Sequence, residues 1–278
     1  MKRILIFIFL GVFFISFNPK KSNSQTVDDE IYTKENIPAK KPLAYPHLRE
    51  ANVMWSKKTW QLIDCRKKMN HPLYYPIDKM DERKSLIQLI MYGVDKEGLT
   101  VYKTDLFQEI MTRDEVYNSL GGGTETIENR LPDGTIEKKE IEREIRFDEI
   151  KQYEIKEQWY FDRKYSRLSV RIVGICPIRM YIDEDTGEKR KVKAFWIYFP
   201  EVRPILANWE VFNRHNDAQR ISFDDFFHQR RFDSYVTQES NVYGNREIKA
   251  YLTGINTLLE AEKIRNEIFN FEHDLWEY

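Results

Sequence analysis

The stretch that decides the fold is QYEIKEQWYFDRKYSRLSVRIVGICPIRMYI, from Gln152 to Ile182. Its first eleven residues alternate apolar and polar side chains, which is typical of a half-buried β-strand. The second half alternates in the same way, and we expect that strand to break at Gly174 and Pro177. DEDTGEKR (183–190) then predicts a turn, and VKAFWIYFP (192–200) predicts a returning strand. Together they predict an antiparallel meander of three or four half-buried strands.

Three helices and a hairpin are predicted before the meander. The helices are Glu50–Lys58, Asp81 to about Val94 with Asp81 as its cap, and Asp114–Leu120 behind a Thr112–Glu115 capping box. WQLIDC (60–65) is compatible with helix or strand, LTVY (99–102) predicts a short strand, and Pro-Asp-Gly (132–134) predicts a hairpin turn. Gly121–Gly123 is typical of a turn, because a phosphate-binding loop needs Lys-Ser or Lys-Thr after its glycines.

Three more helices are predicted after the meander. One follows Pro200, and one begins at about Phe223, where Ser222 and Asp225 form a capping box. The third is a long amphipathic helix whose apolar stripe is expected to cover the sheet: Ile248, Tyr251, Leu252, Ile255, Leu258 and Leu259. The predicted fold class is therefore α+β: an antiparallel β-meander flanked by helices, with an extended N-terminal arm.

The N-terminus predicts export. Residues 1–24 resemble a signal peptide, because Lys2 and Arg3 precede an apolar run and small residues follow it. We expect cleavage after Ser24; an uncleaved N-terminal anchor is the alternative. No cysteine follows the apolar run, so no lipid anchor is expected on this chain. Residues 25–48, with three prolines, predict an extended arm, and residues 49–278 a single α+β domain, with two lobes, 49–150 and 151–278, as an option.

Charge and cysteine content narrow the function. The leader holds four of the 44 basic residues and none of the 45 acidic ones, so the mature chain carries a net charge of −5. That balance argues against nucleic-acid binding. Cys65 and Cys176 are the two cysteines, and they are compatible with one disulfide or with two buried thiols. Both lie in apolar runs, which raise a thiol pKa and disfavour a cysteine nucleophile.

One polar stretch is a candidate site: EVFNRHNDAQRISFDDFFHQRRFDSYV, residues 210–236. His215, Asp217, Asp224 and His228 are the predicted ligands of a divalent metal if the protein is a metal-dependent hydrolase. The opposing interpretation is that Asp225 caps a helix, Asp224 sits where the helix dipole favours an anion, and nearby arginines repel a cation. We favour the second interpretation. Neither Gly-x-Ser-x-Gly nor His-Glu-x-x-His occurs in the sequence.

Several long motifs are similar to those of one family. They are VMWSKKTWQLIDCRKKMNHPLYYPIDK (53–79), EGLTVY (97–102), QWYFDRKYSRLSVRIVGICPI (158–178), residues 201–254, and EHDLWEY (272–278). The chain resembles the gliding motility protein GldN (PorN) family of Bacteroidota over essentially its whole mature length. Cys65 stands where an aliphatic residue is expected in this motif, which weakens the disulfide hypothesis.

The resemblance implies a periplasmic, non-enzymatic component of the type IX secretion system. It implies a large ring formed with an outer-membrane lipoprotein of the GldK/PorK type, and contact with an inner-membrane motor subunit of the GldM/PorM type. It implies neither catalytic residues nor a cofactor. For protein contacts we predict a surface around the capped helix: Phe226, Phe227, Arg230, Arg231 and Phe232. A periplasmic hydrolase and a monomeric carbohydrate or peptide binder are the competing classes.

Overall fold

The computed structural model describes residues 41–78, 80, 83–130, 136–183, 187–214, 216 and 218–275. The chain separates into two units, Met1–Pro38 and Ala39–Tyr278, and every described residue belongs to the second. The predicted signal peptide and most of the predicted arm therefore lie outside the described residues, as do Asp81, His215 and Asp217.

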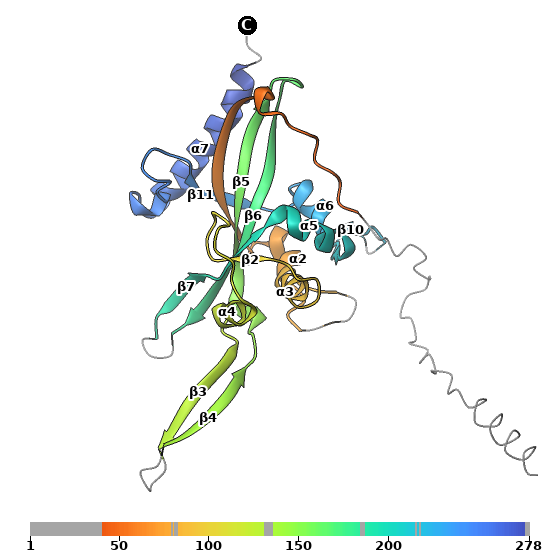
Figure 1. Cartoon of the computed structure of the whole chain (residues 1–278). Coiled ribbons are helices and arrows are strands. Elements are labelled where there is room, and N and C mark those ends of the chain that lie inside the picture. The colour runs from red at the N-terminus through yellow and green to blue at the C-terminus, as the bar shows by residue number, and fades with distance from the viewer. Residues whose placement is uncertain are drawn as a thin grey trace, which may run out of the picture. The chain divides into compact units, whose positions relative to one another are not determined.

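A seven-stranded antiparallel sheet organises the second unit (Figure 1). Six of its strands follow the order β11-β1-β5-β6-β8-β2, and β7 pairs with β6 beyond the end of β8. The strands of this sheet are β1 (Val53–Asp64), β2 (Val101–Tyr102), β5 (Ile150–Asp162), β6 (Arg167–Ile182), β7 (Lys189–Lys193), β8 (Trp196–Tyr198) and β11 (Ser234–Glu239). The predicted meander is confirmed in β5, β6 and the strand that returns after them.

Two smaller antiparallel pairs stand apart from the sheet. The first is the predicted hairpin, formed by β3 (Gly123–Arg130) and β4 (Ile136–Arg143), whose turn lies outside the described residues. The second joins β9 (Glu210–Val211) to β10 (Ile221–Ser222) and brings the chain back to the capped helix.

The predicted helix Glu50–Lys58 is wrong, because β1 occupies that place. Only a 3-10 turn, η1 (Glu50–Asn52), precedes the strand. β1 pairs with β5 on one edge and with β11 on the other, so it is a central strand of the sheet. Its local helical pattern is overridden by these long-range pairings, and the undecided segment 60–65 is strand as far as Asp64.

The sequence predicted that this strand breaks at Gly174 and Pro177. This prediction is wrong, because β6 continues through both residues. A bulge absorbs the irregularity, because Lys156 faces Gly174 whereas Glu157 faces Ile172. A Cβ at position 174 would lie 2.5 Å from the ring of Phe107, so glycine is needed for this close approach. The returning strand divides instead, with β7 along the end of β6 and β8 along its middle.

Six α-helices and further 3-10 turns complete the described fold. The α-helices are α2 (His71–Tyr74), α3 (Leu86–Lys96), α4 (Arg113–Ser119), α5 (Phe199–Asn208), α6 (Phe223–His228) and α7 (Ile255–Asp274); the turns are η2 (Lys68–Asn70), η3 (Phe147–Glu149) and η4 (Ile248–Ala250). The predicted capping boxes of α4 and α6 are confirmed. The cap predicted for α3 is wrong, since Ser85 and Gln88 form its capping box.

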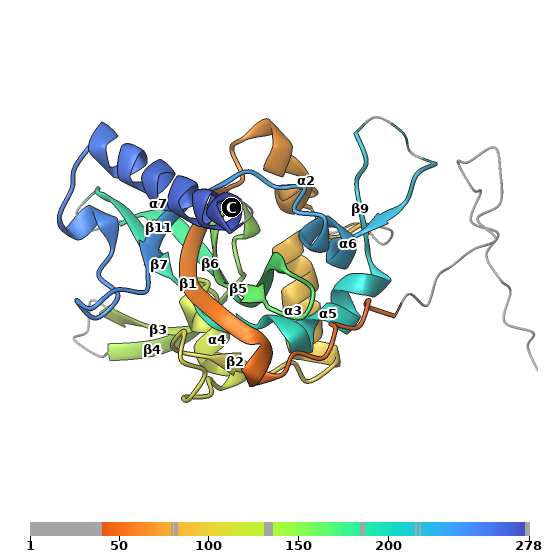
Figure 2. The same cartoon turned by 90° about the horizontal axis from the view of Figure 1, so that it is seen from above.

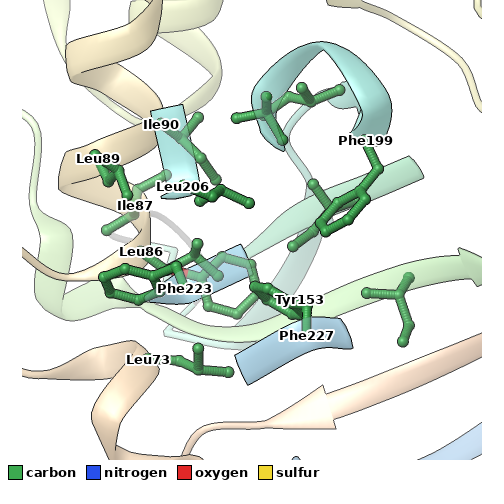
Figure 3. Close-up of a cluster of buried hydrophobic side chains, with 14 of the residues drawn as sticks. Leu73, Leu86, Ile87, Leu89, Ile90, Tyr153, Phe199, Leu206, Phe223 and Phe227 are labelled. Carbon is green, nitrogen blue, oxygen red and sulfur yellow. The ribbon is translucent and has the colours of Figure 1, made fainter. Parts of the chain in front are cut away.

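The main core lies between the sheet and helices α2, α3, α5 and α6 (Figure 3). Tyr153 from β5 is fully buried there with Phe199 of α5 and Phe227 of α6. Helix α7 packs against β11 on another part of the sheet (Figures 1 and 2). Its contacts form a second, smaller cluster around Val236 and Ile264.

The stripe predicted for the last helix is wrong at Tyr251, which is exposed, and throughout its second half. Gly254, with φ 62°, interrupts the helical pattern, and α7 begins only at Ile255. Ile255, Leu258 and Leu259 are 72%, 53% and 63% exposed, while Ala261, Ile264 and Ile268 form the buried face of α7. The break changes the phase of the helix, so the apolar residues on its two sides do not share one face.

Candidate functional site

Helix α6 begins with a complete capping box, and this box uses one of the acids of the polar stretch. The Ser222 hydroxyl accepts a hydrogen bond from the Asp225 amide at 3.1 Å and donates one to the Asp225 carboxylate at 2.7 Å. Pairing of β9 with β10 holds Ser222 at this position opposite Glu210. Asp225 therefore stabilises the start of the helix, as the sequence predicted.

Asp224 is buried in an ion pair with Arg203 of α5. Arg203 Nε donates to Asp224 Oδ1 at 2.7 Å, and Arg203 Nη2 donates to Oδ2 at 3.0 Å. The side chains of both residues are almost fully buried, at 6% and 5% exposure. Two parallel hydrogen bonds make this a strong, geometrically defined pair. Asp224 is thus neutralised by an arginine.

The same arginine fastens the end of the N-terminal arm. Arg203 Nη2 donates to the Leu43 carbonyl at 2.7 Å, and its guanidinium lies 4.1 Å from the ring centroid of Tyr45. Arg171 of β6 donates to the Pro46 carbonyl and also lies over the Tyr45 ring, at 5.0 Å. Sequence reasoning missed these residues; an aromatic residue between Pro42 and Pro46 was the available signal.

Two of the four predicted metal ligands, Asp224 and His228, belong to the described residues. His215 and Asp217 lie outside the described residues, and His228 is exposed at the end of α6. No group of three His, Cys, Asp or Glu side chains suited to a metal ion occurs among the residues that the structure describes. Asp224 and His228 do line one small pocket, of about 60 Å³, together with Tyr45 and Arg230.

The three phenylalanines of the predicted contact surface pack inside the protein. Phe226, Phe227 and Phe232 are 5%, 1% and 7% exposed. The Phe227 ring meets Phe226 at 5.9 Å and Phe232 at 5.7 Å between centroids. These rings therefore hold α6 against the core.

The two arginines of that surface have different surroundings. Arg230, with φ 52°, donates two hydrogen bonds to Glu157 of β5, at 2.6 and 3.3 Å. The Glu157 side chain is fully buried, and this burial raises the pKa of its carboxyl group. The positive charge of Arg230 acts in the opposite direction but only partly offsets the effect of burial. Arg231 is exposed and donates to Gln229. Of the five predicted contact residues, Arg231 alone is exposed.

Both cysteines are buried free thiols. Burial raises the pKa of Cys65 to about 12 and also raises that of Cys176, so neither thiol ionises near neutral pH. Of the two possibilities left open by the sequence, two buried thiols is the one found in the structure.

Comparison with known protein families identifies the family of this chain. Residues 48–277 match the family described as gliding motility associated protein GldN. The chain belongs to the GldN family. Membership makes this GldN-family chain a component of the gliding motility and type IX secretion machinery, and the family is one of structural components rather than a known enzyme family. No curated protein matches the chain. No helix in the described ranges has the length and apolar character needed to cross a membrane.

Proposed function

We propose that this GldN-family chain is a non-enzymatic periplasmic component of the type IX secretion machinery that forms a large ring. Its partners are an outer-membrane lipoprotein of the GldK/PorK type and an inner-membrane motor subunit of the GldM/PorM type. The observation that carries the proposal is the family match over residues 48–277. The leader at residues 1–24, with cleavage after Ser24, accounts for export to the periplasm.

The use of the polar side chains around α6 supports a structural role. Asp224, Asp225 and Arg230 are each engaged by a partner within the chain. Removing a partner from a buried charge is costly, so these contacts stabilise the fold as long as they stay intact. These three charged side chains are therefore accounted for by folding.

The exposed end of α6 is the contact surface that we propose. His228, Gln229 and Arg231 are exposed there, and His228 lines the pocket of about 60 Å³. A pocket of this size accepts one small apolar side chain, and the exposed cation Arg231, three residues after His228, suits a carboxylate of the partner. The buried phenylalanines support this surface from beneath.

Co-expression of the mature chain with the lipoprotein tests the function. We expect the two proteins to purify together as a very large complex, measured by light scattering and electron microscopy. A monomer that never joins the lipoprotein would contradict the proposal. So would a stoichiometric, tightly bound metal that is lost in His228→Ala, because that result would favour the hydrolase.

The contact surface is tested by a pair of arginine variants. Arg231→Glu should reduce complex formation while leaving the melting temperature unchanged, because Arg231 is exposed. Arg230→Glu should instead lower the melting temperature, because it places a second carboxylate beside the buried Glu157. Lys263→Glu on α7, also exposed, is the matched control. Equal complex formation by Arg231→Glu and the control would exclude this surface.

A further inference from the structure

β2, β7 and β11 each pair with only one other strand of the main sheet. Along β2, Tyr102 forms a bridge with Ile110, and along β11, Gln238 forms a bridge with Glu247. β7 pairs with β6 along one edge, over Lys189–Lys193. On its other edge no bridge is formed by any residue that the structure describes. This edge presents backbone N–H and C=O groups that can accept a further strand.

The free edge of β7 is basic. All five of its residues, KRKVK, are exposed, and four of them are cations. Lys189, Lys191 and Lys193 alternate onto one face, as their pairing with Ile182, Met180 and Ile178 shows. Partial burial lowers the pKa of Lys191, and the nearby cations Lys249 and Arg66 lower it further. A local excess of positive charge therefore stands out on a mature chain whose net charge is −5.

Not every cation of β7 is available to a partner. Lys193 is bound to Glu154 at 2.8 Å and to Glu247 at 3.1 Å, and Arg190 is bound to Asp183 at 2.8 Å. Lys191 donates a hydrogen bond to the Gln152 side chain at 3.3 Å, and neither Lys191 nor Lys189 forms an ion pair with a carboxylate among the described residues. Lysines on an edge strand disfavour pairing with most other strands. A strand that places carboxylates opposite them is instead attracted.

A short segment near the N-terminus has the matching chemistry. Residues 26–33, TVDDEIYT, place three consecutive acids among β-branched and aromatic residues, which favour strands. In an extended segment Asp28 and Glu30 share a face, with the same two-residue spacing as Lys189 and Lys191. We propose that residues 26–33 of a second copy of this chain add to the free edge of β7 as an acidic strand.

A second copy is favoured over the chain's own arm by where the arm is fastened. Leu43 and Pro46 are held by Arg203 and Arg171, beside α5 and the middle of the sheet. β7 lies on the opposite side of the sheet from this attachment in both views (Figures 1 and 2). We therefore assign the added strand to a neighbouring copy. This head-to-tail contact is of the type that builds rings, and it rests on the self-association proposed above.

Peptide binding gives the first test. A fluorescent peptide of residues 25–36 is titrated into the full mature chain, and binding is followed by anisotropy at low and high salt. Lys189→Glu/Lys191→Glu should weaken binding about tenfold, because two attractive cross-strand pairs become repulsive. Lys263→Glu/Arg265→Glu changes the charge equally on exposed positions of α7 and should leave binding unchanged. Equal losses in both variants would overturn the proposal.

Two further measurements separate strand addition from general charge attraction. A peptide with methylated backbone nitrogens at Val27, Asp29 and Ile31 should bind weakly, because strand addition needs the backbone hydrogen bonds. Unchanged binding of this peptide would overturn the proposed mode. In the second measurement, chains with Asp28→Lys/Glu30→Lys and chains with Lys189→Glu/Lys191→Glu are mixed. The mixture should associate more strongly than either variant alone, and equal association in all three samples would overturn the proposal.

Failure of this inference can be told from failure of the proposed function. If Lys189→Glu/Lys191→Glu still forms a complex of unchanged size with the lipoprotein, the β7 contact is wrong and the ring component stands. If the unmodified chain forms no large complex, the proposed function fails whatever the peptide does.

Discussion

Replacing Asp224 by alanine should destabilise the protein by about 3 kcal/mol, and this change tests the structural interpretation of the polar stretch most directly. The variant leaves Arg203 buried without its carboxylate, and breaking one side of a buried ion pair costs about 3–5 kcal/mol. Arg203 keeps its hydrogen bond to the Leu43 carbonyl and its stacking on Tyr45, so the lower end of that range applies.

Thermal and urea unfolding measure the effect. For a unit of 150–250 residues, each kcal/mol lowers the melting temperature by about 2–4 °C, so Asp224→Ala should lower it by roughly 6–12 °C. Asp233→Ala is the matched control, because Asp233 forms an exposed ion pair with Lys67, 2.8 Å apart. Exposed pairs contribute about 0–1 kcal/mol, so the control should unfold close to the unmodified protein.

A double variant completes the experiment. In Arg203→Met/Asp224→Leu both charges are replaced by apolar side chains, which should recover most of the lost stability. A loss below about 1 kcal/mol in Asp224→Ala would refute the reasoning, because typical buried ion pairs cost more than that to break. Stabilisation of the unmodified protein by added zinc, but not of the variant, would instead support the metal-site hypothesis.

Three more predictions concern other parts of the structure. Burial raises the pKa of Asp64, but hydrogen bonds from Arg66 lower it to about 2. The stability that the Asp64 carboxylate contributes is therefore complete above about pH 4 and is lost as the pH falls toward 2. Urea unfolding should show a smaller loss of stability over this pH range in Asp64→Asn than in the unmodified protein. Tyr45→Ala should release the arm from its two arginines, detected as faster proteolysis within residues 41–48; an unchanged cleavage rate would contradict the role of the tyrosine. Ile264→Ala should cost about 2–4 kcal/mol and Leu258→Ala under about 0.5 kcal/mol, since the first is 2% exposed and the second 53%; equal costs would contradict the face assigned to α7.

Local chemistry made parts of the fold predictable. The capping boxes at Thr112 and Ser222 were confirmed because each depends on residues three positions apart. The strands β5 and β6 were predicted correctly from their alternation, but β5 is buried along most of its length, polar residues such as Glu154 and Lys156 included, so it is not half-buried. Within the candidate site, the same local logic correctly assigned Asp225 to capping.

Other features depend on partners that are distant in the sequence. Val53–Asp64 is a strand because β5 and β11 pair with it, about 100 and 170 residues farther along the chain. Asp224 is buried because Arg203 neutralises it, and a charge pattern within α6 gives no sign of an arginine on another helix. The same holds for Arg230, whose partner Glu157 lies on β5.

The sequence by itself determined the fold class, the starts of α4 and α6, and the family, because these depend on alternation, on short spacings and on long motifs. Only the tertiary structure decided what each charged side chain does. Burial makes an unpaired charge costly, so Asp224, Glu157 and Glu154 each lie against a cation from another element. Which side chains are left exposed, such as Lys189 and Lys191 on β7, follows from strand pairing between distant segments and is settled only when the sheet forms.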